Sequence, residues 1–205
     1  MVAGDAGDIE TLIEYPSTEP RAVAICCHPH PLFGGSLSNK VIHTVARAFL
    51  ESGVIAIRFN FRGVGASEGV HDHGVGETQD LVTLAAWVRS CWPGLPLWLA
   101  GFSFGAWVSL HAQTSLVPAL VVSVAPPVGR WDFSSIAKPQ CPWLVIQGDR
   151  DELVDAVAVR HWLKDLSPND ATLRSLELLH GADHFFHGRL HDVKDSVLRF
   201  VTAID

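Results

Sequence analysis

The pentapeptide Gly101-Phe102-Ser103-Phe104-Gly105 constrains the fold of this chain more than any other segment. An apolar, strand-like run precedes it at 97–100, and a helix-like run follows it at 106–110. A G-x-S-x-G between strand and helix is typical of a nucleophile elbow, a sharp turn that strains the backbone of its serine. The glycines lack Cβ atoms, so strand and helix can approach closely and leave the hydroxyl accessible. The pattern predicts a nucleophilic serine at position 103.

Composition favours one globular domain over residues 1–205 and argues against several classes of partner. Of the 205 residues, 48% are hydrophobic and 18% are charged, as in ordinary globular proteins. The net charge is −7 and no lysine or arginine block occurs, which argues against nucleic acid and anionic membranes as partners. The acidic N-terminus lacks the basic region of a secretory signal. We therefore predict a cytoplasmic protein; the composition leaves its oligomeric state open.

Strand-like runs alternate with helix-like runs along the chain, which predicts an α/β fold. We expect a mostly parallel sheet of about seven strands with helices on both faces. The predicted strands are 22–27, 54–59, 97–100, 120–124, 143–147 and 173–178, with an antiparallel edge strand within 8–15. The predicted helices are 38–52, 76–90, the one after Ser103, 156–166 and 187–203. The connection 125–142 is too short for a large cap domain.

Two further residues complete a possible catalytic set with Ser103. A serine hydroxyl needs an adjacent base to become a good nucleophile, and the base needs an orienting acid. Asp151 follows the predicted strand 143–147, and His184 follows the predicted strand 173–178. In open α/β sheets such groups gather at the carboxyl ends of strands. The chain order Ser, Asp, His is the order found in α/β-hydrolases.

Neighbouring residues compete for the acid and base roles. Asp149 and Asp155 lie close to Asp151 in the sequence, and aspartates in loops also bond turn amides. His180 stands at the end of the strand pattern, and His187 falls in the predicted final helix. We favour Asp151 as the acid and His184 as the base. The small residues 181 and 182 suit a tight loop that carries an imidazole toward the serine.

A second G-x-S-x-G occurs at Gly65-Ala66-Ser67-Glu68-Gly69. Residues 61–63 separate it from the preceding strand, and the polar loop 70–74 follows it where an elbow needs a helix. We therefore interpret Ser67 as part of a glycine-rich loop and not as a nucleophile.

The chain resembles small, lidless α/β-hydrolases and is similar to the dienelactone-hydrolase-like and CocE/NonD-type proteins. The matching segments span nearly the whole chain: 28–35, 58–65, 101–105, 148–151 and 181–184. The resemblance implies Ser103 as nucleophile, Asp151 as acid and His184 as base, because the acid of these families is the second aspartate of its loop. Dienelactone hydrolase carries a cysteine at the nucleophile position, so its lactone specificity does not carry over to this chain.

The oxyanion hole should use the backbone N–H of Phe104, the residue after the nucleophile, and one donor from the loop after residue 27. Pro29 and Pro31 have no N–H to give. His30 is the first candidate for the second donor, and Leu32 is the alternative.

The predicted activity is hydrolysis of small carboxylic esters through an acyl-enzyme intermediate, with an ester and water as reactants. Phe33, Trp131 and Phe185 are candidates for the substrate pocket. We expect no cofactor and no metal, because the eleven histidines lack zinc-binding spacing. Fold alone leaves other functions open. They are thioesterase, acyltransferase, small peptidase or cofactor-free lyase activity, and non-catalytic binding of a ligand or partner.

Overall fold

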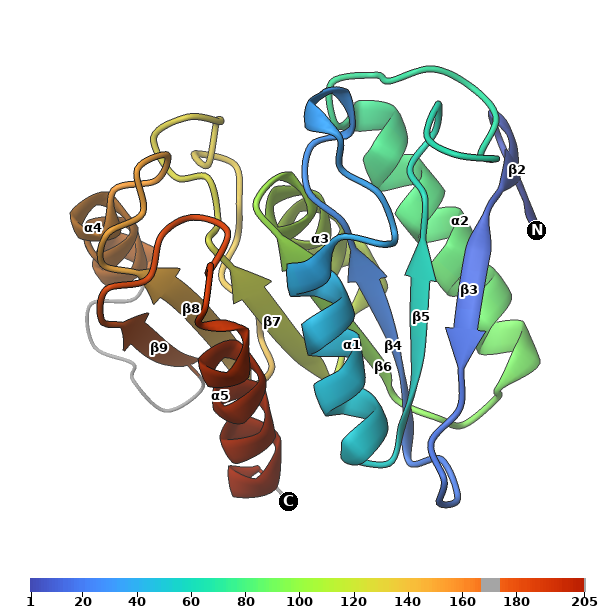
Figure 1. Ribbon diagram of the computed structural model, residues 1–205. Helices are drawn as coiled ribbons and strands as arrows, with labels where there is room; N and C mark the ends of the chain where they lie inside the picture. Colours follow the sequence, from blue (N-terminus) through green and yellow to red (C-terminus); the bar gives the residue numbers. More distant parts are fainter. Residues whose placement is uncertain (167–173, 205) are drawn as a thin grey trace.

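A seven-stranded sheet forms the centre of the molecule (Figure 1). The computed structural model describes residues 1–166 and 174–204. The strand order is β3-β5-β4-β6-β7-β8-β9; β3 pairs antiparallel with β5 and the other neighbours are parallel. The strands are β3 (Thr11–Glu14), β4 (Ala22–Cys27), β5 (Val54–Phe59), β6 (Leu97–Phe102), β7 (Leu120–Val124), β8 (Trp143–Gly148) and β9 (Arg174–Leu179). The predicted α/β architecture with an antiparallel edge strand is confirmed.

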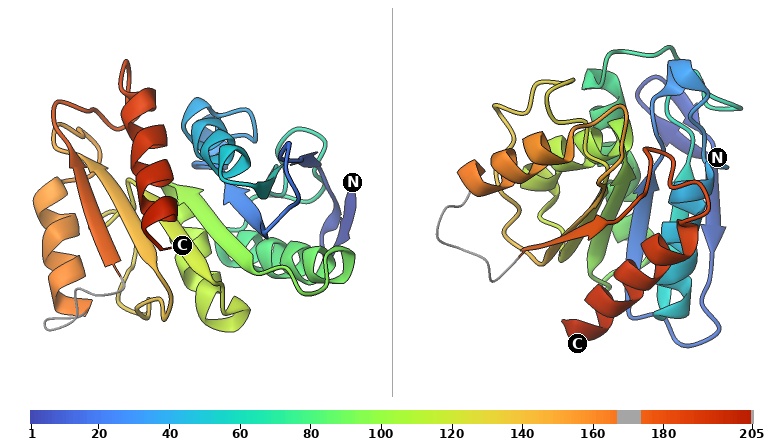
Figure 2. Two further views of the ribbon diagram at one scale, coloured as in Figure 1. Left: turned by 90° about the horizontal axis from the view of Figure 1, so that it is seen from below. Right: turned by 60° about the vertical axis from the view of Figure 1, so that its left-hand side comes forward.

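Helices cover both faces of the sheet, α1 and α5 on one face and α2, α3 and α4 on the other (Figures 1 and 2). The helices are α1 (Lys40–Glu51), α2 (Val75–Cys91), α3 (Phe104–Leu116), α4 (Ala156–Leu166) and α5 (Leu190–Ala203). Because strand side chains alternate between faces, the sheet has a separate core on each side. In β4, Ile25 and Cys27 belong to the α2–α3–α4 core, and Ala24 and Cys26 belong to the α1–α5 core.

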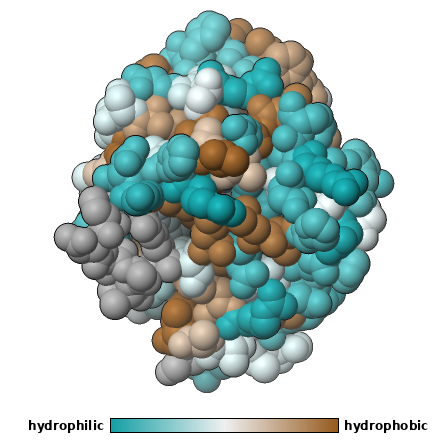
Figure 3. All heavy atoms as spheres, turned by 90° about the vertical axis from the view of Figure 1, so that its left-hand side faces the viewer, coloured by the Kyte–Doolittle hydropathy of each residue, from teal (hydrophilic) through white to brown (hydrophobic). Residues whose placement is uncertain are grey.

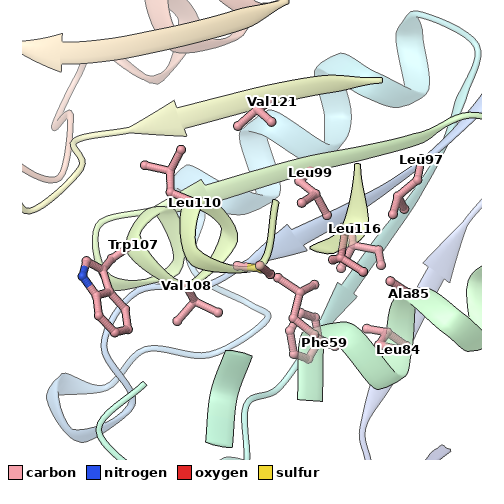
Figure 4. Packing of buried hydrophobic residues seen from close by; sticks show 14 of the residues in the cluster. Phe59, Leu84, Ala85, Leu97, Leu99, Trp107, Val108, Leu110, Leu116 and Val121 are labelled. Atoms are coloured by element: carbon pink, nitrogen blue, oxygen red, sulfur yellow. The ribbon is translucent and has the colours of Figure 1, made fainter. Parts of the chain in front are cut away.

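The core around α3 fixes this helix against the sheet. Figure 4 shows Val108 and Leu116 of α3 together with Leu97 and Leu99 of β6. All four side chains are buried, and burial of one such side chain contributes about 1.5–3 kcal/mol. The start of α3, which carries the elbow, is therefore held firmly above the end of β6.

Several boundaries differ from the predicted ones. β6 runs to Phe102, two residues beyond the predicted end, because its pairing with β7 continues to that residue. The helix predicted at 187–203 begins at Leu190, since Phe186 and Gly188 adopt left-handed backbone conformations with φ of 55° and 69°. A hairpin of β1 (Val2–Gly4) and β2 (Gly7–Ile9) was not predicted. Residue 173 of the last predicted strand lies outside the described residues.

The connection between β7 and β8 confirms the prediction that a large cap domain is absent. Residues 125–142 are all described, and they form turns with one isolated bridge between Val128 and Trp131.

Figure 3 shows the β9 side of the molecule, where apolar side chains form a band within a mostly hydrophilic face. Among the described residues, every helix is too short or too polar to cross a membrane.

Candidate active site

Ser103 lies in the turn between β6 and α3, with φ of 53° and ψ of −117°. Such a conformation costs a non-glycine residue on the order of 1–3 kcal/mol. The flanking glycines are required by close backbone contacts: a Cβ on Gly101 would lie 2.2 Å from the carbonyl oxygen of Gly105. A Cβ on Gly105 would lie 2.2 Å from the carbonyl oxygen of Cys27. The elbow is therefore a strained turn packed directly against the end of β4.

His184 bridges Ser103 and Asp151. Its Nε2 lies 3.2 Å from the Oγ of Ser103, and its Nδ1 lies 2.8 Å from the Oδ2 of Asp151. The imidazole is 3% exposed, and the Asp151 side chain is fully buried. The three side chains come from loops that follow β6, β8 and β9, so parallel strands bring together residues 81 and 33 positions apart. This arrangement can move a proton from the serine hydroxyl to the imidazole.

The carboxylate of Asp151 is held by four hydrogen bonds. Oδ1 accepts from the backbone N–H groups of Leu153 and Val154, and Oδ2 accepts from His184 and from the Gln147 side chain at 2.9 Å. Burial favours the neutral acid, but the His184 and backbone hydrogen bonds outweigh it and lower the pKa of Asp151. The sequence reasoning did not single out Gln147. Its signal is a polar side chain at the end of an otherwise apolar strand.

The competing acids and bases lie in other pairs. Asp149 accepts from His180 and from the N–H of Gly181, and the His180 side chain is 88% exposed. Asp155 accepts from the N–H of residue 157 at the start of α4. His187 pairs with Asp183 on the surface. None of these described contacts involves Ser103.

Ser67, in the second G-x-S-x-G, is a structural link between two segments. Its hydroxyl donates to the carbonyl of Asn60 at 2.7 Å and accepts from the N–H of Glu10 at 2.9 Å. The Glu10 carboxylate in turn accepts from the Ala66 N–H and the Asn60 side chain. Both hydrogen-bonding functions of the Ser67 hydroxyl are therefore used in holding the loop against the N-terminal segment.

The backbone N–H groups of Phe104, directly after the elbow serine, and of His30, in the loop after β4, have no acceptor among the described residues. The N–H of Leu32, the alternative oxyanion donor, already donates to the Nδ1 of His30. His28 orders this loop, since its Nε2 accepts from the Phe61 N–H at 3.0 Å, and burial lowers the pKa of His28 to about 4. The geometry favours His30 over Leu32 as the second donor.

A hollow of about 110 Å³ opens beside Ser103 and His184. Phe33 and Trp131 line it, whereas Phe185 lines a separate hollow with residues 39–41 and packs edge-on against the His184 ring. The sequence reasoning did not single out four further lining residues: Pro127, Arg130, Leu153 and Val154. All four belong to loops that follow strand ends, which is the only signal the sequence gives for them.

Trp107 is another residue that the sequence reasoning did not single out. It stacks on Phe104 and contacts Trp131, and its indole Nε1 donates to the carbonyl of Asp132 at 2.8 Å. α3 thereby holds the β7–β8 connection beside the hollow. The sequence signal is a tryptophan four residues after the elbow serine, on the first turns of the helix.

The histidine-rich segment after β9 is divided among different carboxylates. His184 pairs with Asp151, His187 with Asp183, and the Nε2 of His191 lies 3.2 Å from a carboxylate oxygen of Asp192. Within residues 1–166 and 174–204, no group of three or more histidine, cysteine, aspartate or glutamate side chains is placed to hold a metal ion.

The chain matches a known protein family, and it is similar to proteins of solved structure. Residues 32–197 match the alpha/beta hydrolase domain family. The crystal structure of XC6422 from Xanthomonas campestris, described as an α/β serine hydrolase without a lid, is 44% identical, with a TM-score of 0.93 over 99% of this chain and 92% of that one. An α/β serine hydrolase homologue from Coxiella burnetii is 41% identical, with a TM-score of 0.88 over 97% and 94%. The uncharacterised Rickettsia prowazekii protein RP471 is 33% identical over 196 residues, which are 92% of this chain and 82% of that protein.

Proposed function

The chain belongs to the α/β-hydrolase family, and from this premise we propose that it hydrolyses small carboxylic esters through an acyl-enzyme intermediate. The observation that carries the proposal is the hydrogen-bonded series from Ser103 through His184 to Asp151, with the serine held in a strained elbow. The small hollow beside Ser103 and the short β7–β8 connection support short acyl groups as substrates.

The proposed reaction begins with proton transfer from the Ser103 hydroxyl to the Nε2 of His184 as the oxygen attacks the ester carbonyl. Asp151 keeps the imidazole in the required orientation and stabilises the imidazolium. The N–H groups of Phe104 and His30 stabilise the oxyanion. His184 then protonates the departing alcohol. A water molecule next attacks the acyl-enzyme while His184 takes its proton; the bond between the acyl carbon and the Ser103 oxygen breaks, His184 returns the proton to Ser103, and the carboxylic acid leaves.

Covalent labelling tests the nucleophile. A fluorophosphonate should add to the oxygen of Ser103, and mass spectrometry of peptides locates the adduct. Labelling should disappear in Ser103→Ala and His184→Ala, and it should persist in the matched control His180→Ala, whose imidazole pairs with Asp149. An adduct at Ser67, or a folded protein that never reacts, would overturn the proposed mechanism.

A series of 4-nitrophenyl esters tests the substrate class. We expect kcat/KM to be highest for two- to four-carbon acyl chains and to fall for longer chains, because the hollow is small. A steady rise of kcat/KM toward long chains would contradict this expectation.

A further inference from the structure

The hollow beside Ser103 combines apolar walls with hydrogen-bond donors. Its apolar lining consists of Phe33, Phe104, Pro127, Leu153 and Val154 and the ring of Trp131. Apart from Ser103 and His184, the lining side chains with polar atoms are His30, Arg130 and Trp131. Arginine and the tryptophan indole can only donate hydrogen bonds. The side chains that line the hollow therefore include residues able to donate hydrogen bonds and no carboxylate or amide.

His30 is also a donor on its free ring nitrogen. The backbone N–H of Leu32 donates to the Nδ1 of His30 at 3.2 Å, so this nitrogen carries no proton and the neutral ring is protonated at Nε2. Within the described residues, that Nε2–H has no hydrogen-bond partner. Burial and the neighbouring His71 lower the pKa of His30, which favours the neutral ring.

Aromatic contacts hold the His30 ring in place at the hollow. Its centroid lies 4.8 Å from that of Phe33, 4.9 Å from that of Phe104 and 5.6 Å from that of Trp131. His71 packs on it at 4.9 Å, and the Nδ1 of His71 lies 2.7 Å from the buried carboxylate of Glu77. The His30 ring is therefore fixed among residues that line the hollow. In apolar pockets, a few fixed polar groups of this kind set ligand orientation and specificity.

We propose that the hollow selects acyl groups that carry a hydrogen-bond acceptor oxygen, such as alkoxyacyl or oxoacyl groups, and that the Nε2–H of His30 donates to this oxygen. The inference rests on the proposed esterase function, and it adds a specificity-determining residue and a narrower substrate class. Arg130 also lines the hollow, and its Nη1 donates to the carbonyl of Leu153 at 3.1 Å. A plain hydrocarbon chain would leave the His30 donor without a partner in the complex, which costs binding free energy.

Two esters whose acyl chains differ at a single position test the proposal. 4-Nitrophenyl methoxyacetate and 4-nitrophenyl butanoate have acyl chains of similar length, with an ether oxygen in place of a methylene. We define the ether preference as kcat/KM for the first ester divided by kcat/KM for the second. Comparing this preference between variants cancels the different chemical reactivities of the two esters.

The variants separate the donor from the loop structure. His30→Phe keeps an aromatic ring and loses Nε2–H, and His30→Ser keeps an acceptor for the Leu32 N–H and also loses Nε2–H. Both should lower the ether preference about fivefold, the size that one neutral hydrogen bond supplies. The matched control Leu153→Val changes the apolar wall of the hollow without removing a donor or a ring that contacts His30, so it should leave the ether preference unchanged. The proposal would be overturned if both His30 variants kept the wild-type ether preference. It would also be overturned if His30→Phe lost this preference and His30→Ser kept it, because the acceptor for the Leu32 N–H would then be the property that matters.

A binding measurement keeps this inference separate from the esterase proposal. In Ser103→Ala labelled with ¹⁵N-histidine, methoxyacetamide should shift the His30 Nε2 resonance at lower concentration than butanamide does. If the wild type hydrolyses neither ester, the esterase proposal fails. Tighter binding of methoxyacetamide than of butanamide at His30 would still support the donor site. Equal titration by the two amides, or an absence of any shift at His30, would refute the donor site whatever the esterase activity.

Discussion

The two G-x-S-x-G segments of this chain share a pattern and differ in where the backbone is strained. In the segment 65–69 the left-handed conformations fall on Gly65 and Gly69, with φ of 57° and 83°. In the segment 101–105 the left-handed conformation falls on Ser103 itself. The first arrangement is easily accommodated by glycine, and the second forces a serine into an unfavourable backbone conformation.

The surroundings of the two hydroxyls explain the difference. The Ser67 hydroxyl is buried and bonds two backbone groups, so it stabilises the loop, and no histidine of the described residues bonds it. The Ser103 hydroxyl bonds only the imidazole of His184 among the described residues. A serine within this motif therefore becomes a candidate nucleophile only where the backbone turns it toward a base.

The largest expected effect is on catalysis. Ser103→Ala should lower kcat for 4-nitrophenyl acetate by about 10⁴-fold or more, because the nucleophile is lost. Ser67→Ala should leave kcat within about twofold of the wild type, since its bonds to Asn60 and Glu10 only hold the 65–69 loop against the N-terminal segment. Steady-state kinetics on folded samples checks both values. Comparable losses in the two variants would remove the distinction between the motifs.

A smaller loss is expected when the acid is changed. Asp151→Asn should lower kcat by about 10³–10⁴-fold, because an amide does not hold the imidazole in the required tautomer. The matched control Asp149→Asn affects an Asp–His pair whose His180 is exposed, so kcat should change no more than a few-fold. If Asp149→Asn were the more damaging change, the assignment of the acid would be wrong.

The next effect is on stability, and the order of the two serines reverses. Ser67→Ala should lower the free energy of unfolding by about 1–3 kcal/mol, because it leaves the Asn60 carbonyl and the Glu10 N–H without their partner. Ser103→Ala removes a single side-chain hydrogen bond and should cost less. Urea unfolding followed by circular dichroism measures both variants. A larger destabilisation by Ser103→Ala would contradict the interpretation of Ser67 as a structural residue.

The smallest effect concerns acid stability of the Ser67 segment. Hydrogen bonds from the Ala66 N–H and the Asn60 side chain lower the pKa of Glu10 below its ordinary value of 4.5. A carboxyl whose pKa is lowered in the folded state stabilises the fold when the pH is above the ordinary pKa. This stabilisation is lost as the pH falls through the lowered pKa. The stability advantage of the wild type over Glu10→Gln should therefore be complete near neutral pH and shrink below about pH 4.5. Urea unfolding between pH 7 and pH 3 tests this, and a constant difference would refute it.

Much of the fold was predictable because it depends on local pattern. Continuous apolar runs gave the strands, and apolar stripes gave the helices, since both signals lie within a few neighbouring residues. The start of the last helix was predicted three residues too early. Phe186, in the loop before this helix, adopts a left-handed conformation that is unusual for a residue other than glycine, so the local sequence does not indicate it. The β1–β2 hairpin was not predicted because its two strands are only three residues long and carry little apolar pattern.

The sequence by itself determined the elbow, the order of serine, aspartate and histidine, and the sheet that carries them. Only the tertiary structure decided which aspartate and which histidine meet, that Gln147 supports the acid, and that Leu32 donates to His30. It also decided which aromatic residues line the hollow and which, like Phe185, lie elsewhere. The physical reason is that these contacts join loops from different strands, whose separation is set by sheet order and helix packing, whereas a motif records only the spacing of residues along the chain.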